Sequence, residues 1–354
     1  MKILIISLAG VGDTLMMTPL LHELRKNYPK AKIDVLVMWG SSKGILKGNP
    51  NVDETIHFNM VKEGFFKTWK FCNELKKKGY DISINTYPQS KIQYRIIAKL
   101  INAKRRLSHI YGNWSFLDNL LVNEKIEEDY TIQCAENNLN LLKVLGKKEK
   151  IKKHEYEIYF SKEEEKIASE FIRKNDLNGK LLIGFHVGSS STKNLALRRW
   201  PIENYVELAG KLIRFDDKVR ILLFGSNEEE KENLMIKESN SEKVIIVNEP
   251  DIKNSAAIVK KCKIFLSVDT ALMHIASAAG VKNQIAIETP TFNKTVYPYG
   301  GRFKLVKNNG IKKDLLEYYK YDGKPIKATE EELKKIMKSV SVDEVFDEIK
   351  KHLN

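Results

Sequence analysis

Cysteine is scarce in this sequence, which has only three among its 354 residues: Cys72, Cys134 and Cys262. They lie far apart, and no two have the spacing of a zinc knuckle or of a small disulfide-stapled domain. This distribution argues against a disulfide framework and fits a reducing, cytoplasmic compartment.

Long apolar runs are missing as well, so we expect no membrane-spanning helix. The apolar start, residues 1–9, is short and is followed at once by Gly10, Gly12 and Asp13 without a cleavage-type ending. We therefore interpret it as a first buried strand and not as a signal peptide. Short-period repeats and low-complexity tracts are also absent, which sets solenoids and propellers aside.

Acidic residues are in the minority, with 46 Asp and Glu against 60 Lys and Arg and a formal net charge of +14. Such an excess favours an anionic partner, which could be nucleic acid, a phospholipid surface or a phosphorylated substrate. Lysine as a default surface residue explains the same excess. No basic segment is interleaved with aromatic residues as in a nucleic-acid module, so we expect no nucleic-acid partner.

The remaining pattern alternates short β-rich apolar runs with amphipathic stretches, which is typical of parallel sheets covered by helices. The chain exceeds the size at which one hydrophobic core usually keeps growing, so two domains are expected. Strands are predicted at residues 2–8, 33–38, 81–86, 181–186, 219–224, 243–247, 263–267 and 283–287. Helices are predicted at residues 14–27, 63–78, 90–102, 202–215, 228–238, 252–261 and 270–279. The sequence thus predicts an α/β protein of two similar halves.

The break between the halves is predicted in the lysine-rich stretch 146–153, which has no apolar periodicity. This gives an N-terminal domain of residues 1–155 and a C-terminal domain of residues 156–354. Capping boxes, in which a hydroxyl residue precedes a glutamate by three positions, mark further helix starts. They are Ser161 with Glu164, Thr329 with Glu332, and Ser341 with Glu344.

A glycine-containing turn follows the first strand and opens the first helix. Gly10 and Gly12 allow positive φ and a close approach of the backbone to a ligand. A dinucleotide fingerprint would need a third glycine where this chain has Leu15, so an NAD site is disfavoured. Asp13 occupies the helix N-terminus, where it is either an ordinary cap or a carboxylate able to accept a proton from a sugar hydroxyl.

A second polar segment follows the strand at residues 181–186. It joins a glycine, four hydroxyl side chains and several cations, and it leads into a helix opened by Pro201. Backbone and hydroxyl donors with guanidinium groups suit the oxygens of a diphosphate. Any one of these residues, taken alone, could instead belong to a polar loop that is exposed to solvent and binds no ligand. The candidate residues for binding this diphosphate-containing ligand are Ser189, Ser190, Thr192, Lys193 and Arg198.

A third polar segment follows the strand at residues 263–267. Asp269 and Thr270 are predicted to cap the next helix, and His274 lies one turn further on the same side. The alternative for His274 is a buried structural histidine. Glu228 likewise follows a strand and Gly225, and its ordinary interpretation is a solvated first-turn acid.

Together these segments resemble glycosyltransferase family 9, the ADP-heptose:lipopolysaccharide heptosyltransferases. The matching residues occur in the family's order over about 300 residues. They are Gly12-Asp13, Asn49-Pro50, Val52-Asp53, the basic residue before Trp200-Pro201, Gly225 with Glu228, Asp269-Thr270 with His274, and Pro290 ahead of Pro298 and Gly300.

The resemblance implies a GT-B fold, with two Rossmann-like domains facing each other across a cleft and the last helix, 341–354, able to pack back on the N-terminal domain. It implies an inverting transfer of heptose from ADP-heptose to the lipopolysaccharide inner core, without a metal or other cofactor. By position, Asp13 corresponds to the base, Arg198 to a phosphate-binding lysine and Glu228 to a sugar-contacting acid. Asp269, Thr270 and His274 correspond to the nucleotide-sugar motif. No Asp-x-Asp metal-ligand motif is evident.

The chain departs from the family pattern at Ala271, Arg198, Glu288 and Thr289, which bears on the identity of the donor. The expected partners are a nucleotide sugar and an anionic, lipid-linked saccharide, for a cytoplasmic protein that can contact the inner face of the membrane. The expected basic patch for this contact is Arg95, Lys99, Lys104, Arg105 and Arg106. A transferase using another nucleotide sugar for a surface polysaccharide, and a nucleotide-binding protein without catalysis, remain as alternatives.

Overall fold

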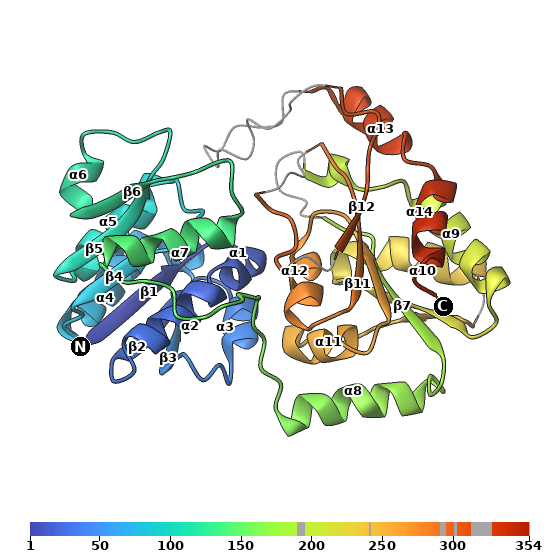
Figure 1. Ribbon diagram of the computed structural model, residues 1–354, viewed down its shortest axis with the longest axis horizontal. Helices are drawn as coiled ribbons and strands as arrows, with labels where there is room; N and C mark the ends of the chain where they lie inside the picture. Colours follow the sequence, from blue (N-terminus) through green and yellow to red (C-terminus); the bar gives the residue numbers. More distant parts are fainter. Residues whose placement is uncertain (190–194, 241, 291–294, 301–302, 313–327, 354) are drawn as a thin grey trace. The chain divides into compact units, whose positions relative to one another are not determined.

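The computed structural model describes residues 1–189, 195–240, 242–290, 295–300, 303–312 and 328–353. These residues form two compact units, one comprising residues 1–159 and the other the described residues from 160 onward. Each unit is built on one six-stranded sheet. In Figure 1 the first unit is coloured blue to green and the second green to red.

The sheet of the N-terminal unit has the strand order β3-β2-β1-β4-β5-β6, and all neighbouring strands are parallel. Its strands are β1 (Lys2–Ser7), β2 (Lys32–Val37), β3 (Glu54–His57), β4 (Ile82–Asn85), β5 (Arg105–Ile110) and β6 (Glu124–Glu127). Its helices are α1 (Val11–Met16), α2 (Thr18–Asn27), α3 (Gly40–Leu46), α4 (Met60–Lys77), α5 (Ile92–Ile101), α6 (Asp118–Leu121) and α7 (Cys134–Val144).

Strand β1 explains why this sheet is buried on both faces. Successive side chains of a strand point to opposite faces. Ile3 and Ile5 lie in the core formed with α2 and α7, whereas Leu4 and Ile6 lie in the core formed with α4 and α5. Central parallel strands therefore appear in the sequence as continuous apolar runs.

The sheet of the C-terminal unit has the order β12-β11-β10-β7-β8-β9, again with parallel neighbours. Its strands are β7 (Leu181–His186), β8 (Val219–Phe224), β9 (Val244–Ile246), β10 (Ile264–Ser267), β11 (Asn283–Ile287) and β12 (Phe303–Val306). Its α-helices are α8 (Lys162–Lys174), α9 (Ile202–Phe215), α10 (Glu230–Asn240), α11 (Ile252–Val259), α12 (Ala271–Ala278), α13 (Glu330–Lys338) and α14 (Val342–Lys350), and its 3₁₀ turns are η1 (Leu195–Arg198) and η2 (Asn227–Glu229).

Both sheets thus share one Rossmann-type order, in which the chain reverses direction across the sheet between its first and fourth strands. The reversal lies between β1 and β4 in the first unit and between β7 and β10 in the second. Ligands of open α/β sheets bind outside the carboxyl ends of the strands at this point. The predicted α/β class is confirmed, and each unit has one expected ligand position.

The predicted strands are confirmed, while four others were missed: the edge strands β3, β6 and β12, and β5 beside β6. Two predicted helices differ in their course. The helix predicted at 14–27 ends at Met16 and restarts at Thr18. Pro19 has no N–H for the Leu15 carbonyl, and the Thr18 hydroxyl donates to that oxygen instead at 2.7 Å. The helix predicted at 228–238 is divided into η2 and α10.

The last two helices begin at their predicted caps, Thr329 and Ser341. The last helix, α14, packs within the C-terminal unit. Val345 and Ile349 of α14 are buried in the core of the C-terminal unit, and Phe346 lies edge-on to Phe215 of α9. The apolar stripe of α14 is therefore used within its own unit.

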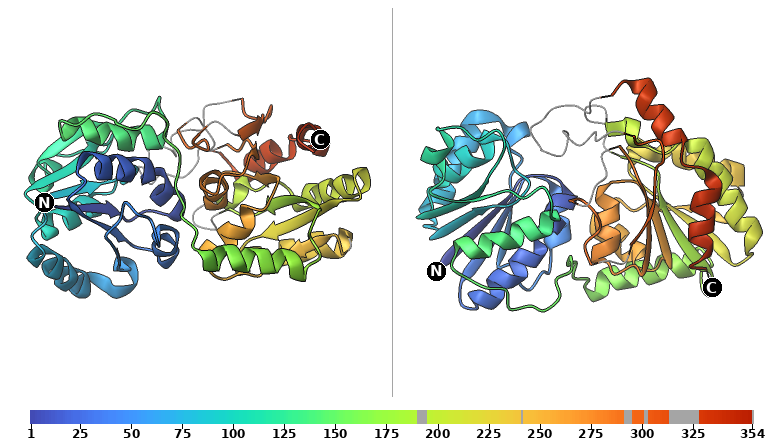
Figure 2. Two further views of the ribbon diagram at one scale, coloured as in Figure 1. Left: turned by 60° about the horizontal axis from the view of Figure 1, so that its bottom comes forward. Right: turned by 45° about the horizontal axis from the view of Figure 1, so that its top comes forward.

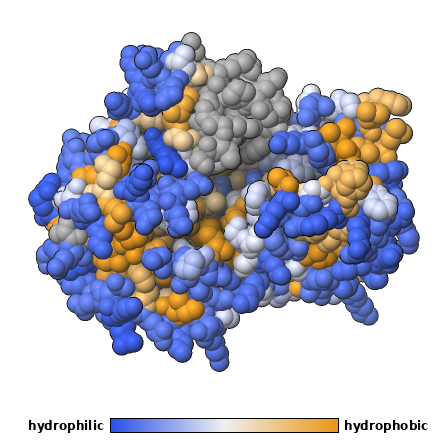
Figure 3. All heavy atoms as spheres, turned by 180° about the vertical axis from the view of Figure 1, so that it is seen from behind, coloured by the Kyte–Doolittle hydropathy of each residue, from blue (hydrophilic) through white to orange (hydrophobic). Residues whose placement is uncertain are grey.

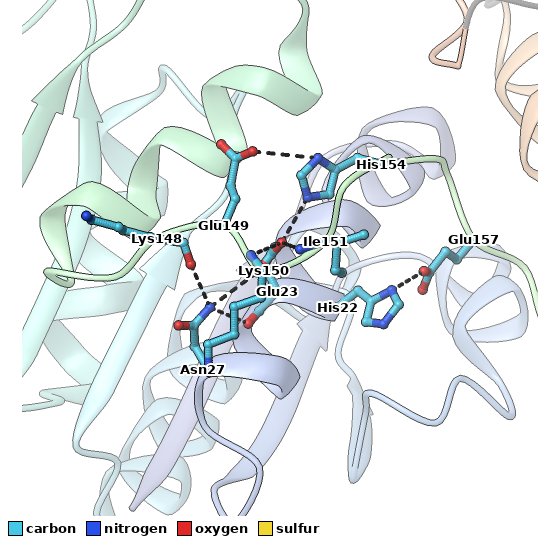
Figure 4. Close-up of polar contacts among 9 residues, drawn as sticks. All are labelled: His22, Glu23, Asn27, Lys148, Glu149, Lys150, Ile151, His154 and Glu157. Atoms are coloured by element: carbon cyan, nitrogen blue, oxygen red, sulfur yellow. Dashed lines mark hydrogen bonds and ion pairs between the residues drawn. The ribbon is translucent and has the colours of Figure 1, made fainter.

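The lysine-rich stretch after α7 is fixed to α2 through one buried carboxylate (Figure 4). Glu23 is fully buried and accepts hydrogen bonds from the amides of Lys150 (2.8 Å) and Ile151 (2.7 Å). His154 Nε2 lies 3.0 Å from Glu23 Oε1, and the Asn27 amide donates to Oε2 at 3.2 Å. Charge-assisted bonds of this kind hold an otherwise irregular segment in place.

Replacing Glu23 with glutamine is expected to lower the free energy of unfolding by about 1–3 kcal/mol at neutral pH. Burial opposes ionisation of Glu23, but the hydrogen bonds from His154, Ile151 and Lys150 outweigh burial and hold its pKa below the usual value. The stabilisation is thus complete above the pKa of the unfolded chain and is lost as the pH falls through the lower folded-state pKa. Urea unfolding at several pH values should show the difference from wild type shrinking in acid. The exposed Glu203→Gln serves as control, and a pH-independent difference would contradict the assignment.

Candidate active site

Polar residues follow the strands on either side of the reversal point in each unit. In the N-terminal unit the chain after β1 carries Gly10, Gly12 and Asp13. In the C-terminal unit the chain after β7 carries Ser189, and the chain after β10 carries Asp269. Each unit therefore presents one half-site at the carboxyl edge of its sheet, where a ligand is expected.

The N-terminal half-site is a turn closed by Asp13. The Gly10 amide donates to Asp13 Oδ2 at 2.8 Å, and the buried Thr14 hydroxyl lies 3.0 Å from the Gly10 carbonyl oxygen. Thr14 also lies 3.0 Å from the Ser42 hydroxyl of α3. One carboxylate oxygen of the half-buried Asp13 is therefore fixed by the backbone, which orients the side chain.

Positive φ is not the reason for glycine in this turn. Gly10 has φ −72° and ψ −179°, and Gly12 lies within α1. A Cβ on Gly10 would lie 3.3 Å from Asp13 Oδ2. The prediction that these glycines supply positive φ is wrong, and Gly10 instead leaves room beside the carboxylate.

Two residues that the sequence reasoning missed complete this half-site. Gln89 is buried, accepts a hydrogen bond from the Leu8 amide at 3.1 Å and donates to the Ile6 carbonyl at 2.6 Å. It thereby ties the end of β1 to the segment after β4. Burial and the nearby charge of Asp13 raise the pKa of Tyr94 on α5, so the phenol stays protonated beside the carboxylate. No sequence motif marks either residue.

The three arginines of the predicted basic patch make structural contacts, while Lys99 and Lys104 are exposed. Arg95 and Asp118 are both buried and form an ion pair of 2.5 Å. Arg105 lies in β5 and pairs with Glu124 of β6 at 2.5 Å, so it stabilises the sheet edge. Arg106 donates to backbone carbonyls. The closeness of Lys104, Arg105 and Arg106 in the sequence gave these residues the appearance of a cationic cluster.

Other residues of the family resemblance support the N-terminal sheet. Asp53 accepts hydrogen bonds from the Ile33 amide at 2.6 Å and from Arg25 at 2.6 Å. The Asn49 side chain accepts from the Asn51 amide at 2.9 Å. These motif positions stabilise the turn that leads into β3.

The C-terminal half-site brings together Arg198, Asp269, Thr270 and His274, as the sequence predicts. Arg198 Nη1 donates to Asp269 Oδ2 at 2.8 Å, and both side chains are about nine-tenths buried. Thr270 begins α12 but makes no capping hydrogen bond with its side chain; its hydroxyl lies 3.1 Å from His186 Nδ1. Thr270 therefore occupies the N-cap position of α12 with its side chain directed to β7, and Asp269 orients a guanidinium.

Both histidines of this half-site are neutral near pH 7. Burial lowers the pKa of His274 to about 4, with Arg198 adding to the effect and Asp269 opposing it. Burial and the charge of Arg199 lower the pKa of His186 to about 3. Positive charge therefore comes from the arginines, while the imidazoles contribute hydrogen bonds.

Ser189 is buried, and its carbonyl accepts a hydrogen bond from Arg199 at 2.7 Å. The predicted donor residues Ser190, Thr192 and Lys193 lie outside the described residues. The structure thus describes the two ends of this candidate segment, at Ser189 and at Arg198.

The acid that is built into this half-site is Glu229, next to the predicted Glu228. Glu228 is exposed, whereas Glu229 is 5% exposed and accepts a hydrogen bond from the Ser226 amide at 2.9 Å. A Cβ on Gly188 would lie 2.2 Å from Glu229 Oε1, so glycine is needed for this approach. The spacing Ser226-x-x-Glu229 is a capping box, a signal that the sequence reasoning used elsewhere and missed here.

Two of the residues that depart from the family pattern, Glu288 and Thr289, have structural surroundings. Thr289 is buried. Glu288 accepts a hydrogen bond from the Asn308 amide at 2.8 Å, which ties the end of β11 to the end of β12. Among the described residues there is no group of three or more His, Cys, Asp or Glu placed to hold a metal ion. None of the described helices is both long and apolar enough to cross a membrane.

Solved structures share this architecture along the whole chain. A glycosyl transferase family 9 protein from Veillonella parvula superposes with a TM-score of 0.83 at 22% identity, covering 99% of this chain and 97% of its own. The E. coli heptosyltransferase WaaC solved with ADP superposes with a TM-score of 0.72 at 19% identity, covering 99% and 97%. These likenesses show the fold, two Rossmann-type units of the GT-B type.

Sequence comparison gives the family. The family model for glycosyltransferase family 9 (heptosyltransferase) matches residues 68–320, and the chain belongs to that family. Lipooligosaccharide heptosyltransferase 2 of Campylobacter jejuni is 24% identical over 301 residues, which is 82% of each chain. The lipopolysaccharide core heptosyltransferase OpsX of Haemophilus influenzae is 23% identical over 365 residues, covering 98% of this chain and 95% of its own. The family predicted from the motifs is confirmed.

Proposed function

We propose that this enzyme transfers heptose from ADP-heptose to the lipopolysaccharide inner core, with inversion at the anomeric carbon. The observation that carries the proposal is the Asp13 carboxylate, held by the Gly10 amide at the carboxyl edge of β1. Similar proteins named as lipopolysaccharide or lipooligosaccharide heptosyltransferases support the donor and the acceptor class, and the WaaC structure with ADP supports the nucleotide.

In the proposed reaction an acceptor hydroxyl attacks the anomeric carbon on the face opposite the nucleotide. The new C–O bond forms as the bond to the β-phosphate oxygen breaks, and ADP leaves with the electron pair. Asp13 accepts the hydroxyl proton as that oxygen becomes acidic in the transition state. The mechanism requires both half-sites to act on one donor and acceptor pair.

Charge that develops on the departing diphosphate needs stabilisation. Arg198, oriented by Asp269, supplies a planar fork that matches phosphate oxygens. Neutral His274 and the Thr270 hydroxyl add hydrogen bonds, and the N-terminus of α12 favours an anion. We assign Ser189, Ser190, Thr192 and Lys193 to the same diphosphate and Glu228 to the sugar.

A panel of donors tests the substrate. Nucleotide release should be fastest with ADP-heptose, and slower by orders of magnitude with UDP- and GDP-sugars. Faster release from another nucleotide sugar would favour a transferase for a different surface polysaccharide. Tight nucleotide binding with no turnover of any donor would favour a protein without catalysis.

Activity is expected to be unchanged by metal chelation. The proposed charge stabilisation comes from arginine, hydrogen-bond donors and a helix N-terminus, and so no step needs a Lewis acid. Initial rates of nucleotide release in excess EDTA should match those in Mg²⁺ within about twofold. A large loss in EDTA that Mg²⁺ or Mn²⁺ restores would contradict metal independence.

The acceptor proposed here is anionic and lipid-linked, which places the enzyme in the cytoplasm at the inner face of the cytoplasmic membrane. The net charge of +14 favours such an acceptor.

A further inference from the structure

Helix α4 carries two different apolar faces. One contains Phe71, Cys72 and Leu75 and packs into the core beneath the sheet, where Phe71 stacks on Phe58 with ring centroids 4.0 Å apart. The helix is therefore fixed to its unit on that side, and a second apolar face must have another use.

The second face is the α4 apolar surface, which comprises Val61, Phe65, Phe66 and Trp69. These side chains are 77%, 73%, 84% and 52% exposed. At 100° per residue, Phe65, Trp69 and Phe66 fall within one arc of about 100°. One end of this arc borders the buried Cys72, and the other end lies far from Phe71, so the exposed face adjoins the core face along one side of the helix. Large apolar side chains gathered on a surface mark an interaction site and not a folding need.

The backbone is shaped to present this surface. Gly64 interrupts α4 with φ 77° and ψ 178°, a conformation that favours glycine. Directly after this break, the rings of Phe65 and Phe66 meet edge to face at 5.7 Å. Figure 2 shows α4 on the outer side of its unit, so these rings project from the fold.

Neighbouring elements carry further exposed apolar side chains. Helices α4 and α5 pack together, and so do α5 and α6; the buried pair Arg95–Asp118 fixes α6 to α5. Further exposed apolar side chains on α5, on α6 and just before α6 are Ile96, Phe116, Leu117 and Leu120, which are 39%, 76%, 58% and 56% exposed. Seen from behind, this unit shows apolar side chains among hydrophilic ones at its surface (Figure 3).

The start of α4 lies at the same edge of the sheet as the half-site. Parallel strands all end at the same edge of a sheet. Each crossover helix therefore begins near that edge and carries the chain back to the opposite edge, where the next strand starts. Both α4, between β3 and β4, and α5, between β4 and β5, begin at the edge where β1 ends. The α4 apolar surface and Asp13 therefore share one edge of the N-terminal sheet.

Exposed cations surround the apolar residues. Lys62, Lys67 and Lys70 are exposed in the same turns of α4, and Lys91 and Lys99 are exposed beside and on α5. The acid of the first turn, Glu63, is paired with Lys67 at 2.8 Å. Aromatic rings set among lysines match the interface of an anionic bilayer, where rings sit at the headgroup level and lysines meet phosphates.

We propose that the α4 apolar surface and its lysines dock this enzyme on an anionic phospholipid bilayer. The proposal rests on the proposed function in that a lipid-linked acceptor lies in such a bilayer. Docking through α4 would bring the edge that carries Asp13 to the membrane surface, so that the saccharide reaches the carboxylate while its lipid stays in the bilayer.

Vesicle sedimentation with the full chain tests the proposal. Wild type should bind vesicles of phosphatidylglycerol and phosphatidylcholine and should bind pure phosphatidylcholine weakly. The variant Phe65→Ser/Phe66→Ser/Trp69→Ser should bind the anionic vesicles at least about tenfold more weakly. Leu234→Ser/Met235→Ser, which changes residues 40% and 46% exposed on α10, should bind as wild type does.

A second variant tests the contribution of the lysines to vesicle binding. Lys62→Glu/Lys67→Glu/Lys70→Glu should weaken binding to anionic vesicles by about tenfold or more and remove most of its salt dependence. Equal binding of wild type to anionic and neutral vesicles would overturn the anionic assignment. Unchanged anionic binding by the aromatic variant, or no binding by wild type, would overturn the docking surface itself.

Two measurements keep this proposal separate from the catalytic one. The aromatic variant should keep the melting temperature of wild type and should release ADP from ADP-heptose with a lipid-free saccharide acceptor at the wild-type rate. Loss of vesicle binding with this activity intact supports docking. If wild type is a dimer in solution that the aromatic variant dissociates, with vesicle binding unchanged, then the surface serves a second copy of the chain and the docking proposal is wrong.

Discussion

Asp13→Asn is expected to lower kcat by about 10²–10⁴-fold while the affinity for the donor nucleotide stays within a few-fold of wild type. Asparagine keeps an oxygen that can accept the Gly10 amide hydrogen bond, so the turn should be retained. What it loses is the ability to take a proton from the attacking hydroxyl. Steady-state kinetics together with calorimetric titration of ADP measures both quantities.

A matched control is available at another helix start. Asp251 caps α11 by accepting from the amides of Lys253 and Asn254, so Asp251→Asn makes the same chemical change in a purely structural setting. It should leave kcat unchanged. If Asp13→Asn also left kcat within a few-fold of wild type, Asp13 would be a helix cap and the assignment of the base would fail.

Arg198→Met is expected to lower the free energy of unfolding by about 3–5 kcal/mol, because the buried carboxylate of Asp269 loses the guanidinium that balances its charge. The same variant should weaken ADP binding, since the guanidinium is the proposed diphosphate ligand. Urea unfolding and ADP titration measure the two effects separately.

The double variant Arg198→Met/Asp269→Asn separates stability from binding. Removing both charges should restore most of the lost stability, because no uncompensated carboxylate from this pair remains buried. Binding of ADP should stay weak. Arg198→Lys keeps the charge and should recover part of the affinity, though without the planar fork. A stable double variant with wild-type ADP affinity would show that Arg198 serves folding alone.

Sequence patterns predicted the central strands because those strands are buried on both faces. Ile3, Leu4, Ile5 and Ile6 all face a core, so they form a run that no surface segment imitates. Edge strands lack this signal. The strand β5, next to the edge strand β6, was missed for a related reason. It begins with the charged Arg105 and Arg106, whose partners are Glu124 and backbone carbonyls, and sequence spacing alone cannot show these contacts.

The part of the candidate site that lies after two neighbouring parallel strands was predictable from the sequence. Arg198, Asp269, Thr270 and His274 meet as expected because the carboxyl ends of β7 and β10 are neighbours. Their detailed partners were not predictable. From the sequence, Asp269 could either cap a helix or pair with a cation. The fold brings Arg198 within hydrogen-bond distance of Asp269, and so the two residues form a pair.

Residues that act through contacts distant in sequence left no motif. Gln89 joins two strand ends that are about 80 residues apart, and Tyr94 lies near Asp13 only because α5 begins at the edge where β1 ends. Phe65 and Phe66 lie in the helix predicted at 63–78, and sequence alone does not show that they are exposed, because exposure of one face is decided by what packs against it.

Transfer followed by NMR spectroscopy tests the central claim most directly. Wild type given ADP-heptose and the inner-core saccharide should yield a heptosylated product whose anomeric configuration is opposite to that of the donor. Asp13→Asn should yield almost none in the same time. Retained configuration, or transfer by Asp13→Asn at the wild-type rate, would contradict direct displacement assisted by this carboxylate.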